Sequence, residues 1–555
     1  MNLPSDFRDA LIEARKMSLQ GRFLEAERIY RTLAAPGPHR GIALEALAEL
    51  YLHQERLDEA HHIFKDLTED EPDSLHYSGL LANFLDSLGQ TQGAIDEYQR
   101  LIERRPEQAV AHFNKALLLK KLQQNTAAMD AYEEALRLGI DGQEEVYSNM
   151  GVLYSEMQDA DRAREMYEKA LEIAPGYVPA LFNLAGHFEE SGEKEPAIEL
   201  YERILAIDPR HWKSLARLAY PARITADDQA LVERLQAGIE NMKDDPRAQE
   251  GLYFALGKAY DDLESYDKAG GAYVAANELS KQRVRPYSPE ATEEAFDRLI
   301  EIFDSSWIER CTSASEASPI FICGMYRSGS TLLERMLGAH PEITAAGELN
   351  ALALSVARHV GAFPQAATGA KREQLQRVAD EYVAEVKQLF PDAPFVIDKQ
   401  PDNFLRAGLI RAIFPGAKII RTRRDLRDNC LSLYFQQFDL AASYSNDLQY
   451  IAHYYRQHER LFDHWQTCIA ENICTVDYEE LVESPEPVLR RVLEFIGLEW
   501  DASVLEFHKG GGMVKTASIW QVRQGLHTGS RERWRNYEAI LGELAQPASA
   551  EAEKA

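Results

Sequence analysis

Two stretches in the second half of the chain combine glycine, arginine and serine in patterns suited to binding a phosphorylated ligand. The first is GMYRSGSTLLERML at 324–337, where Gly324 and Gly329 allow a tight turn that opens a helix. Such a turn can direct backbone N–H groups at an anion beside the positive end of a helix dipole. It departs from the nucleotide-binding pattern G-x-x-x-x-G-K-[ST], because Ser330 replaces the lysine and Arg327 lies inside the turn. The pattern predicts an anion site and disfavours an ordinary ATP or GTP site; a turn that binds nothing is the alternative.

The second stretch is RTRRDLRDNCLSLY at 421–434, in which Arg424 ends a predicted strand and Ser432 lies eight residues further on, about two turns into a helix. A guanidinium pairs with two phosphate oxygens at once, and a hydroxyl can donate one further hydrogen bond. Arg424 and Ser432 are therefore candidate phosphate ligands. The remaining arginines of the stretch are interpreted as a solvated face: Arg421, Arg423 and Arg427.

Both stretches belong to a region where short apolar runs alternate with helical patterns. The predicted strands are PIFIC (319–323), PFVID (394–398), AKIIRT (417–422) and NICTV (472–476). This alternation indicates βαβ units, hence a parallel sheet with helices on both faces. Ligands bind beyond the carboxyl ends of such strands. Two further strand ends carry Lys399 and Tyr478, for which an exposed lysine and a packed ring are the alternatives.

The first half of the chain repeats with a period of 34 residues, and one interval of 35. A small residue recurs at Ala26, Ala60, Ala94, Ala128, Ala163 and Ala197, and an aromatic residue follows four positions later at Tyr30, Phe64, Tyr98, Tyr132, Tyr167 and Tyr201. This spacing places a small side chain and a large ring on one helix face, as closely packed antiparallel helices require. We expect these residues to form the core of a helical solenoid.

The unit at 144–177 resembles a tetratricopeptide repeat over its whole length, with Gly151, Tyr154, Ala163 and Pro175 in register. A degenerate unit near 212–248 and a last unit near 249–283, marked by Ala269 and Tyr273, continue the series. The resemblance implies binding of a peptide or protein.

Residues 319–537 resemble the tyrosylprotein type of sulfotransferase. R-S-G-[ST]-T-L, here Arg327 to Leu332, is similar to that family's 5′-phosphosulfate loop. The Arg424 and Ser432 pair is similar to its 3′-phosphate signature. Glu348 in HPEITAAGELN stands where the family has its catalytic glutamate. The family's further basic residue is here Gln436, and Arg533 stands where it has lysine.

The resemblance implies a set of residues that bind 3′-phosphoadenylyl sulfate: Arg327, Ser328, Gly329, Ser330, Thr331, Leu332, Arg424, Ser432, Tyr478, Ser518, Gln521, Val522 and Arg533. It implies Glu348 as general base, and Lys399 and Arg327 as stabilisers of charge on the leaving phosphate. Ser518 would add a hydrogen bond to the sulfuryl donor or hold Lys399. Glu348 can also be read as a first-turn acid of the following helix. No metal is required on this interpretation.

The fold expected is an all-α tetratricopeptide superhelix followed by an α/β domain with a parallel sheet, the P-loop-like sulfotransferase fold. The expected divisions are repeats at 1–283, a linker and helix at 284–318, the sulfotransferase domain at 319–540 and a disordered tail at 541–555. The expected function is transfer of a sulfuryl group to an acceptor hydroxyl, with a peptide or protein tyrosine selected by the repeats as one candidate. A kinase-like nucleotide enzyme and a repeat scaffold with an inactive donor-binding domain are the alternatives. If the repeats select the acceptor, residues 284–555 alone should still bind the donor product.

The bulk composition limits the partners and the compartment. A formal charge of −29 argues against a general nucleic-acid binder. The five cysteines include no CxxC pair and no Cys/His cluster at zinc spacing, which favours a reducing compartment. No apolar run approaches the roughly 18 residues of a membrane span, and the amino terminus has no secretion signal pattern, so a cytoplasmic protein is expected. The acceptor and the oligomeric state stay open.

Overall fold

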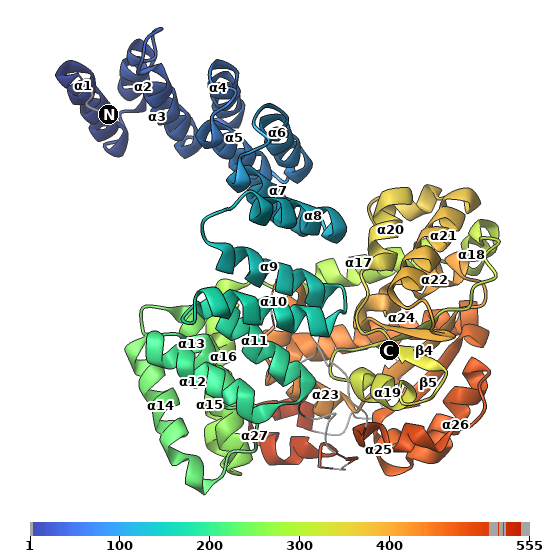
Figure 1. Ribbon diagram of the computed structural model, residues 1–555. Helices are drawn as coiled ribbons and strands as arrows, with labels where there is room; N and C mark the ends of the chain where they lie inside the picture. The colour runs from blue at the N-terminus through green and yellow to red at the C-terminus, as the bar shows by residue number, and fades with distance from the viewer. Residues whose placement is uncertain (1–3, 439, 510–519, 521–524, 527–528, 546–555) are drawn as a thin grey trace. The chain divides into compact units, whose positions relative to one another are not determined.

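The computed structural model describes residues 4–438, 440–509, 520, 525–526 and 529–545. The chain divides into two compact units, Met1–Asn183 and Leu184–Ala555 (Figure 1). The domain boundary predicted at 283/284 falls inside the second unit and stays a prediction. Ser518, Gln521 and Val522 lie outside the described residues, as does the predicted tail beyond Ala545.

The first unit consists of helices that pair along the chain. They are α1 (Ser5–Leu19), α2 (Phe23–Leu33), α3 (Arg40–His53), α4 (Leu57–Asp70), α5 (Leu75–Ser87), α6 (Thr91–Arg104), α7 (Ala109–Lys121), α8 (Asn125–Arg137), α9 (Gln143–Glu156) and α10 (Ala160–Ile173). The repeated alanines and aromatic rings are buried between them, from Ala26 and Tyr30 to Ala163 and Tyr167. The predicted core of the solenoid is confirmed.

The helical repeats continue into the second unit. α11 (Val178–Ser191) crosses the division and is followed by α12 (Lys194–Ile207), α13 (Trp212–Arg217), η1 (Ala226–Asp228), α14 (Gln229–Asn241), α15 (Pro246–Asp262) and α16 (Tyr266–Arg283). In the predicted last repeat, Ala269 and Tyr273 are buried like their counterparts in the earlier repeats. The degenerate unit differs in having a first helix, α13, of six residues.

A five-stranded sheet follows α17 (Pro289–Ile302) and α18 (Ser305–Cys311). Its strands are β1 (Ile320–Gly324), β2 (Ile343–Ala345), β3 (Phe395–Lys399), β4 (Lys418–Arg423) and β5 (Ile473–Asp477), in the order β2-β3-β1-β4-β5. Each neighbouring pair is parallel, which confirms the predicted sheet. After β1 the chain forms β2 and β3 on one side of it, and then β4 and β5 on the other side. The strand order therefore reverses between the neighbouring strands β1 and β4, where ligands of such folds bind.

Helices cover both faces of the sheet, as expected of an α/β domain (Figure 1). One face carries α19 (Ser330–Leu337), α25 (Tyr478–Glu483) and α26 (Pro485–Ile496); the other carries α17, α18, α20 (Ala351–His359), α21 (Arg372–Leu389), α22 (Ala407–Ile413) and α24 (Leu448–Ile469). α23 (Leu426–Tyr434) follows β4. Each face of the sheet packs against its own hydrophobic core, and alternate residues of β1 point into the two cores. Phe321 lies in the core with α22, and Ile322 lies in the core with α19.

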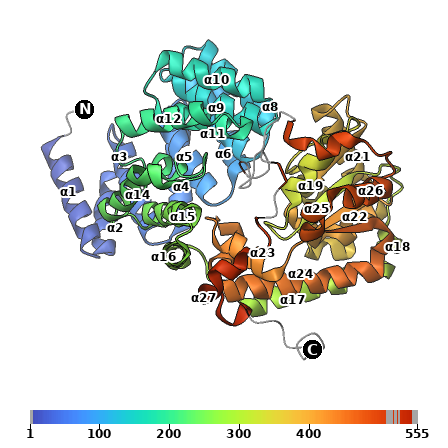
Figure 2. The same ribbon diagram turned by 90° about the horizontal axis from the view of Figure 1, so that it is seen from below.

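The 3-10 turns and the carboxyl-terminal helix complete the second unit. They are η2 (Gln365–Gly369), η3 (Pro401–Arg406), η4 (Leu440–Asn446), η5 (Ala470–Asn472), η6 (Ala502–Leu505), η7 (Phe507–Lys509), η8 (Arg533–Tyr537), α27 (Glu538–Leu541) and η9 (Gly542–Ala545). α17 lies along the long helix α24 (Figure 2), where Asp297 accepts from Arg460 at 2.7 Å. Within the described residues, no helix is both long and apolar enough to cross a membrane. All five cysteines are free thiols.

Candidate functional site

The turn after β1 is built against the end of β4. Gly324 has a φ of 151°, and a Cβ there would lie 2.4 Å from the carbonyl oxygen of Thr422, so glycine is required. The hydroxyl of Ser328 lies 2.7 Å from Oγ1 of Thr422 and donates to the carbonyl of Met325 at 2.6 Å. These short polar contacts hold the turn at the switch between β1 and β4.

The second glycine of the turn is packed by an aromatic ring that follows the end of β5. Gly329 has a φ of 97°, and a Cβ there would lie 2.6 Å from the ring of Tyr478. Tyr478 is therefore a packed ring in this arrangement, and it also supports the loop expected to bind an anion. Arg327 has a φ of 67°, a left-handed conformation that is uncommon for arginine and concentrates at functional sites.

The first residues of α19 follow directly from this turn. Ser330 and Thr331 are buried, and Leu332 packs partly buried against the core on the α19 side of the sheet. The first N–H groups of a helix have no partner within the helix and carry the positive end of its dipole. The predicted loop residues from Ser328 to Leu332 thus lie where a helix start meets the carboxyl end of β1.

Arg424 joins the turn to the carboxyl-terminal segment. Its Nη1 donates to the carbonyl of Arg327 at 3.1 Å, and its Nη2 donates to the carbonyl of Ser530 at 2.8 Å. The guanidinium also lies over the ring of Tyr478, 4.6 Å from its centre. Arg424 is 8% exposed, and its Nε has no hydrogen-bond partner among the described residues. A buried N–H without a partner is costly, so this side chain fits an anionic ligand.

Arg327 and Ser432, predicted from separate stretches, are in direct contact. Nε of Arg327 donates to Oγ of Ser432 at 3.0 Å. Burial, together with the positive charges of Arg424 and Arg533, lowers the pKa of Arg327 to about 10. An excess of positive charge in a poorly solvated place is the condition under which a bound anion is most stabilised.

A second group lies at the end of β3. Lys399 is buried, and its Nζ donates to a carboxylate oxygen of Glu348, whose side chain is 40% exposed. The alternative, an exposed lysine, does not hold, because β3 is an inner strand and the Lys399 side chain at its end is buried. The backbone N–H of Lys399 also donates to the carbonyl of Gly347 at 2.9 Å. The carboxylate proposed as a base is thereby held at a fixed place by its own loop and by a lysine.

The comparisons with known proteins agree with this geometry. Residues 319–502 match the model described as "Sulfotransferase family", and residues 19–84, 79–142 and 142–210 match tetratricopeptide repeat models. Residues 319–502 form a sulfotransferase-family domain. The repeats precede this sulfotransferase domain in the chain.

Relatives match parts of the chain. An uncharacterized protein of Aquifex aeolicus is 35% identical over 336 residues, covering 57% of this chain and 44% of that protein. Protein-tyrosine sulfotransferase A of Caenorhabditis elegans is 28% identical over 197 residues, covering 34% of this chain and 51% of its own length. The chain thus spans about half the length of these relatives. The sulfotransferase domain from the Synechococcus PCC 7002 olefin synthase is 22% identical, with a TM-score of 0.31, and the match covers 42% of this chain and 97% of that one.

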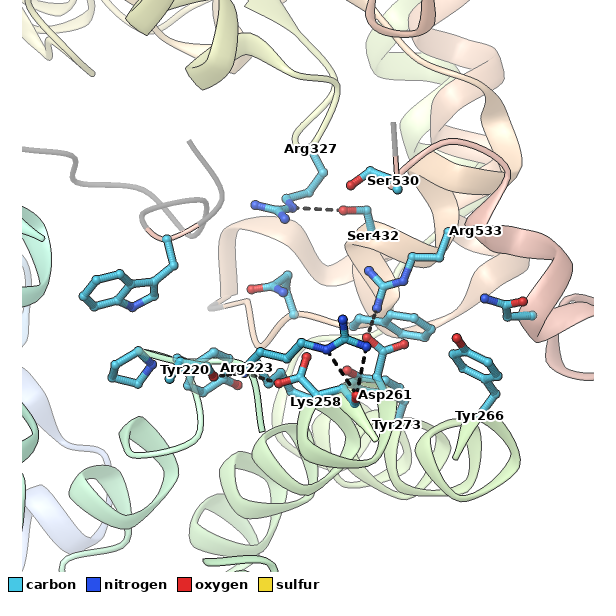
Figure 3. Close-up of a pocket in the computed structure, with 18 of the residues that line it drawn as sticks. Tyr220, Arg223, Lys258, Asp261, Tyr266, Tyr273, Arg327, Ser432, Ser530 and Arg533 are labelled. Atoms are coloured by element: carbon cyan, nitrogen blue, oxygen red, sulfur yellow. Dashed lines mark hydrogen bonds and ion pairs between the residues drawn. The ribbon is translucent and has the colours of Figure 1, made fainter. Parts of the chain in front are cut away.

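A cavity of about 410 Å³ lies beside the arginines of the sulfotransferase domain. Arg327, Ser432, Gln436 and Arg533 line it together with residues of the last repeats. Figure 3 shows Arg327 directed at Ser432 on one side of this cavity and Arg533 on another. Gln436, which replaces a basic residue of the tyrosylprotein family, therefore borders the same space as Arg533.

Several residues that support the site carry no recognisable motif. Asp428 is buried and accepts from the backbone N–H groups of Glu532 at 2.7 Å and Trp534 at 3.0 Å, so it holds both neighbours of Arg533. Asn429 donates from Nδ2 to the carbonyl of Tyr326 at 3.0 Å. Both follow the signature residue Arg424 on the first turn of α23, and their burial was not predicted because a DN pair there is equally typical of a helix start.

Glu334 is a further buried residue that the sequence did not indicate. It lies on α19, and its Oε1 accepts from the backbone N–H of Gly347 at 2.8 Å. Burial raises the pKa of Glu334 to about 7, although the nearby charge of Lys399 opposes the shift. Since Gly347 immediately precedes Glu348, this bond fixes the backbone that carries the candidate base.

The three arginines interpreted as a solvated face differ from one another. Arg423 is half-exposed and pairs with Asp477 at 2.6 Å, and Arg427 lies 4.0 Å over the ring of Trp534. For Arg421 the interpretation is wrong, because it is 5% exposed and paired with Glu459. Among the described residues, no group of three or more His, Cys, Asp or Glu side chains is placed to hold a metal ion.

Proposed function

We propose that the sulfotransferase domain transfers a sulfuryl group from 3′-phosphoadenylyl sulfate to an acceptor hydroxyl. The observation that carries this proposal is the cluster of Arg327, Arg424 and Ser432 at the switch between β1 and β4. It combines a helix start, two guanidinium groups and a hydroxyl, and the buried Nε of Arg424 has no partner within the part of the chain that the structure describes. A donor that carries anionic groups at both its 5′ and its 3′ position matches a site with two guanidinium groups.

Arg327 and the N–H groups of residues 328–332 would hold the 5′-phosphosulfate, while Arg424 and Ser432 would hold the 3′-phosphate. The donor supplies the sulfuryl group, bound to the phosphate through an oxygen that leaves. The roles expected for Ser518, Gln521, Val522 and Arg533 remain proposals on the same footing.

Glu348 would accept the proton of the acceptor hydroxyl while that oxygen bonds to sulfur. Its bond to Lys399 holds the carboxylate in one place, as a positioned base requires. An ammonium has three N–H donors, of which Glu348 uses one. Lys399 and Arg327 would stabilise the negative charge that remains on the phosphate when the sulfur–oxygen bond breaks. Positioning and fixed charge would then supply most of the rate acceleration, as in phosphoryl transfer.

A tyrosine of a peptide or protein is the acceptor that we propose. Its support is the name of relatives such as the protein-tyrosine sulfotransferase of Caenorhabditis elegans, at 28% identity, and the repeats, which resemble peptide-binding modules.

The first experiment is a calorimetric titration of the full chain with adenosine 3′,5′-bisphosphate, adenosine 5′-phosphate and ATP. The bisphosphate is expected to bind at least tenfold more tightly than either of the others, because a charge-assisted bond contributes about 1.5–3 kcal/mol. Equal affinities would overturn the assignment of the donor. Incubation with radiolabelled donor and host lysate, followed by identification of the labelled species, then tests the acceptor.

A further inference from the structure

The cavity beside Arg327 has walls from two parts of the second unit. The sulfotransferase domain supplies Arg327 and Ser432, the segment after it supplies Arg533, and the last repeats supply Lys258 and Asp261 on α15 (Figure 3). The match to the sulfotransferase family model begins at residue 319, after the helices of the last repeats. A site that takes residues from these helices therefore extends beyond the part of the chain that matches the family model.

Asp261 is the contact between the two walls. One carboxylate oxygen binds Nη2 of Arg533, and the other accepts from the hydroxyl of Tyr537. The Asp261 side chain is 16% exposed and that of Arg533 is 30% exposed. Both oxygens are thus engaged in a partly buried place, where such bonds are stronger than at the surface.

The backbone of Arg533 is held independently from the other side. Asp428 of α23 accepts from the N–H groups of Glu532 and Trp534, and Arg424 donates to the carbonyl of Ser530. The segment is therefore attached to the same helix and the same arginine that form the candidate 3′-phosphate site. Its backbone is fixed by the sulfotransferase domain, and the direction of the Arg533 side chain is fixed by the repeat.

The last repeat is packed firmly enough to act as such a support. The ring of Tyr273 on α16 stacks on Phe435, with centres 3.9 Å apart and planes 10° apart. Asn277 donates from Nδ2 to the carbonyl of Tyr434 at 2.8 Å, where α23 ends. Ser432, which contacts Arg327, thus lies only two and three positions before Tyr434 and Phe435, which contact α16.

We propose that the last repeat is part of the donor site, with Asp261 as the positioning residue that holds the Arg533 guanidinium in the cavity for a nucleotide bearing a 3′-phosphate. This inference rests on the proposed function. Arg533 takes the place of the basic group that Gln436 does not supply, since both line the same cavity. Asp261 does not bind the nucleotide; an acid beside an anion would repel it, and its use here is to orient the cation between them.

The test is a double-mutant cycle in the full chain, with Asp261→Asn, Arg533→Ala and both together. The readout is the ratio of dissociation constants for adenosine 5′-phosphate and adenosine 3′,5′-bisphosphate. This ratio is independent of how much of a preparation is folded, because both ligands titrate the same folded molecules. Asp261→Asn is expected to lower the ratio about fivefold or more, and the double variant is expected to lose no more than Arg533→Ala alone. Additive losses would show that Asp261 does not act through Arg533 and would overturn the proposal.

Two further variants make the outcome decisive. Asp261→Glu keeps the charge and is expected to retain more of the ratio than Asp261→Asn; an equal loss would overturn the proposal. Asp244→Asn is the control. Asp244 belongs to the same repeats, pairs with Arg210 at a distance of 3.3 Å and does not line the cavity, so its substitution should leave the ratio unchanged. If the unaltered chain does not discriminate between the two nucleotides, the proposed function fails. If the unaltered chain and the Asp261→Asn variant discriminate equally between the two nucleotides, the proposed function stands and only the role of Asp261 is overturned.

Discussion

Arg327 and Ser432 touch across the switch between β1 and β4, with Nε of the arginine 3.0 Å from the serine hydroxyl. The turn after one strand and the helix after its neighbour thus share one polar contact before any ligand is considered. A ligand that bridges the two would replace this bond with stronger, charge-assisted ones. The predictions below follow from that arrangement and from the groups around it.

Ser432→Ala should weaken binding of adenosine 3′,5′-bisphosphate and leave adenosine 5′-phosphate nearly unaffected. The loss expected is about 1.5–3 kcal/mol, or roughly ten- to hundredfold in the dissociation constant. Calorimetric titration measures both affinities. Ser484→Ala is the matched control, because Ser484 is exposed and its hydroxyl makes no capping bond to α26. Equal losses for both nucleotides would place the 3′-phosphate elsewhere.

The chelator EDTA should leave the rate of sulfuryl transfer unchanged, and ATP should not serve as a donor. The reason is the chemistry of the side chains present: Ser330 stands in place of the lysine of nucleotide-binding loops. Rates measured with and without EDTA and magnesium decide the question, and strict dependence on magnesium would favour a kinase-like enzyme.

Glu334→Gln should make the stability of the second unit less dependent on pH. In the folded chain the pKa of Glu334 is raised from 4.5 to about 7. Between these values the folded state holds a proton that the unfolded state releases, so stability falls as pH rises through this window and is constant above it. The contribution is on the order of 3 kcal/mol, and Asp398, whose pKa burial also raises to about 7, adds in the same direction.

Tryptophan fluorescence during urea unfolding measures this effect, because all six tryptophans lie in the second unit. The fall in the urea midpoint from pH 5 to pH 8 should be smaller in Glu334→Gln than in the parent. Glutamine retains an oxygen that can accept from Gly347. Glu342→Gln, at an exposed acid just before β2, is the control. An unchanged fall in the variant would show that Glu334 is ionised in the folded state at low pH.

A fragment of residues 284–555 should bind the donor product poorly, in contrast to the expectation from the sequence alone. Removing α15 and α16 would expose Phe435 and leave Arg533 without Asp261. A fragment of residues 176–555 keeps these contacts and should bind like the full chain. Titration of both fragments with adenosine 3′,5′-bisphosphate is the measurement, and equal affinity would show that the last repeat does not contribute to the site.

The sequence predicted most of the fold because its signals are local. Ala163 and Tyr167 recur at equivalent positions of each repeat, and Arg424 stands at the end of a strand. Both signals depend on spacing within one element. The contacts that complete the site depend on segments far apart in the chain. Asp261 meets Arg533 at a separation of 272 positions, and Glu334 meets the loop at Gly347. An isolated acid on a helix looks the same in the sequence whether it faces solvent or a distant arginine. β2, at three residues, is too short to give a periodic signal.

Glu348→Gln should lower kcat by about 10²-fold or more and leave the affinity for adenosine 3′,5′-bisphosphate nearly unchanged. The amide keeps the shape of the side chain and can still accept from Lys399, but it cannot take a proton. The competing role, a first-turn acid at the start of α20, finds little support, because Glu348 precedes the helix, which begins at Ala351, and its carboxylate is bound to Lys399. A helix-dipole contact would contribute about 0.3–1 kcal/mol to stability and nothing to the chemical step. Kinetics under saturating donor, with unfolding midpoints measured in parallel, separate the two roles. A variant that turns over within a few-fold of the parent would show that Glu348 only anchors Lys399, and the base would have to be another group.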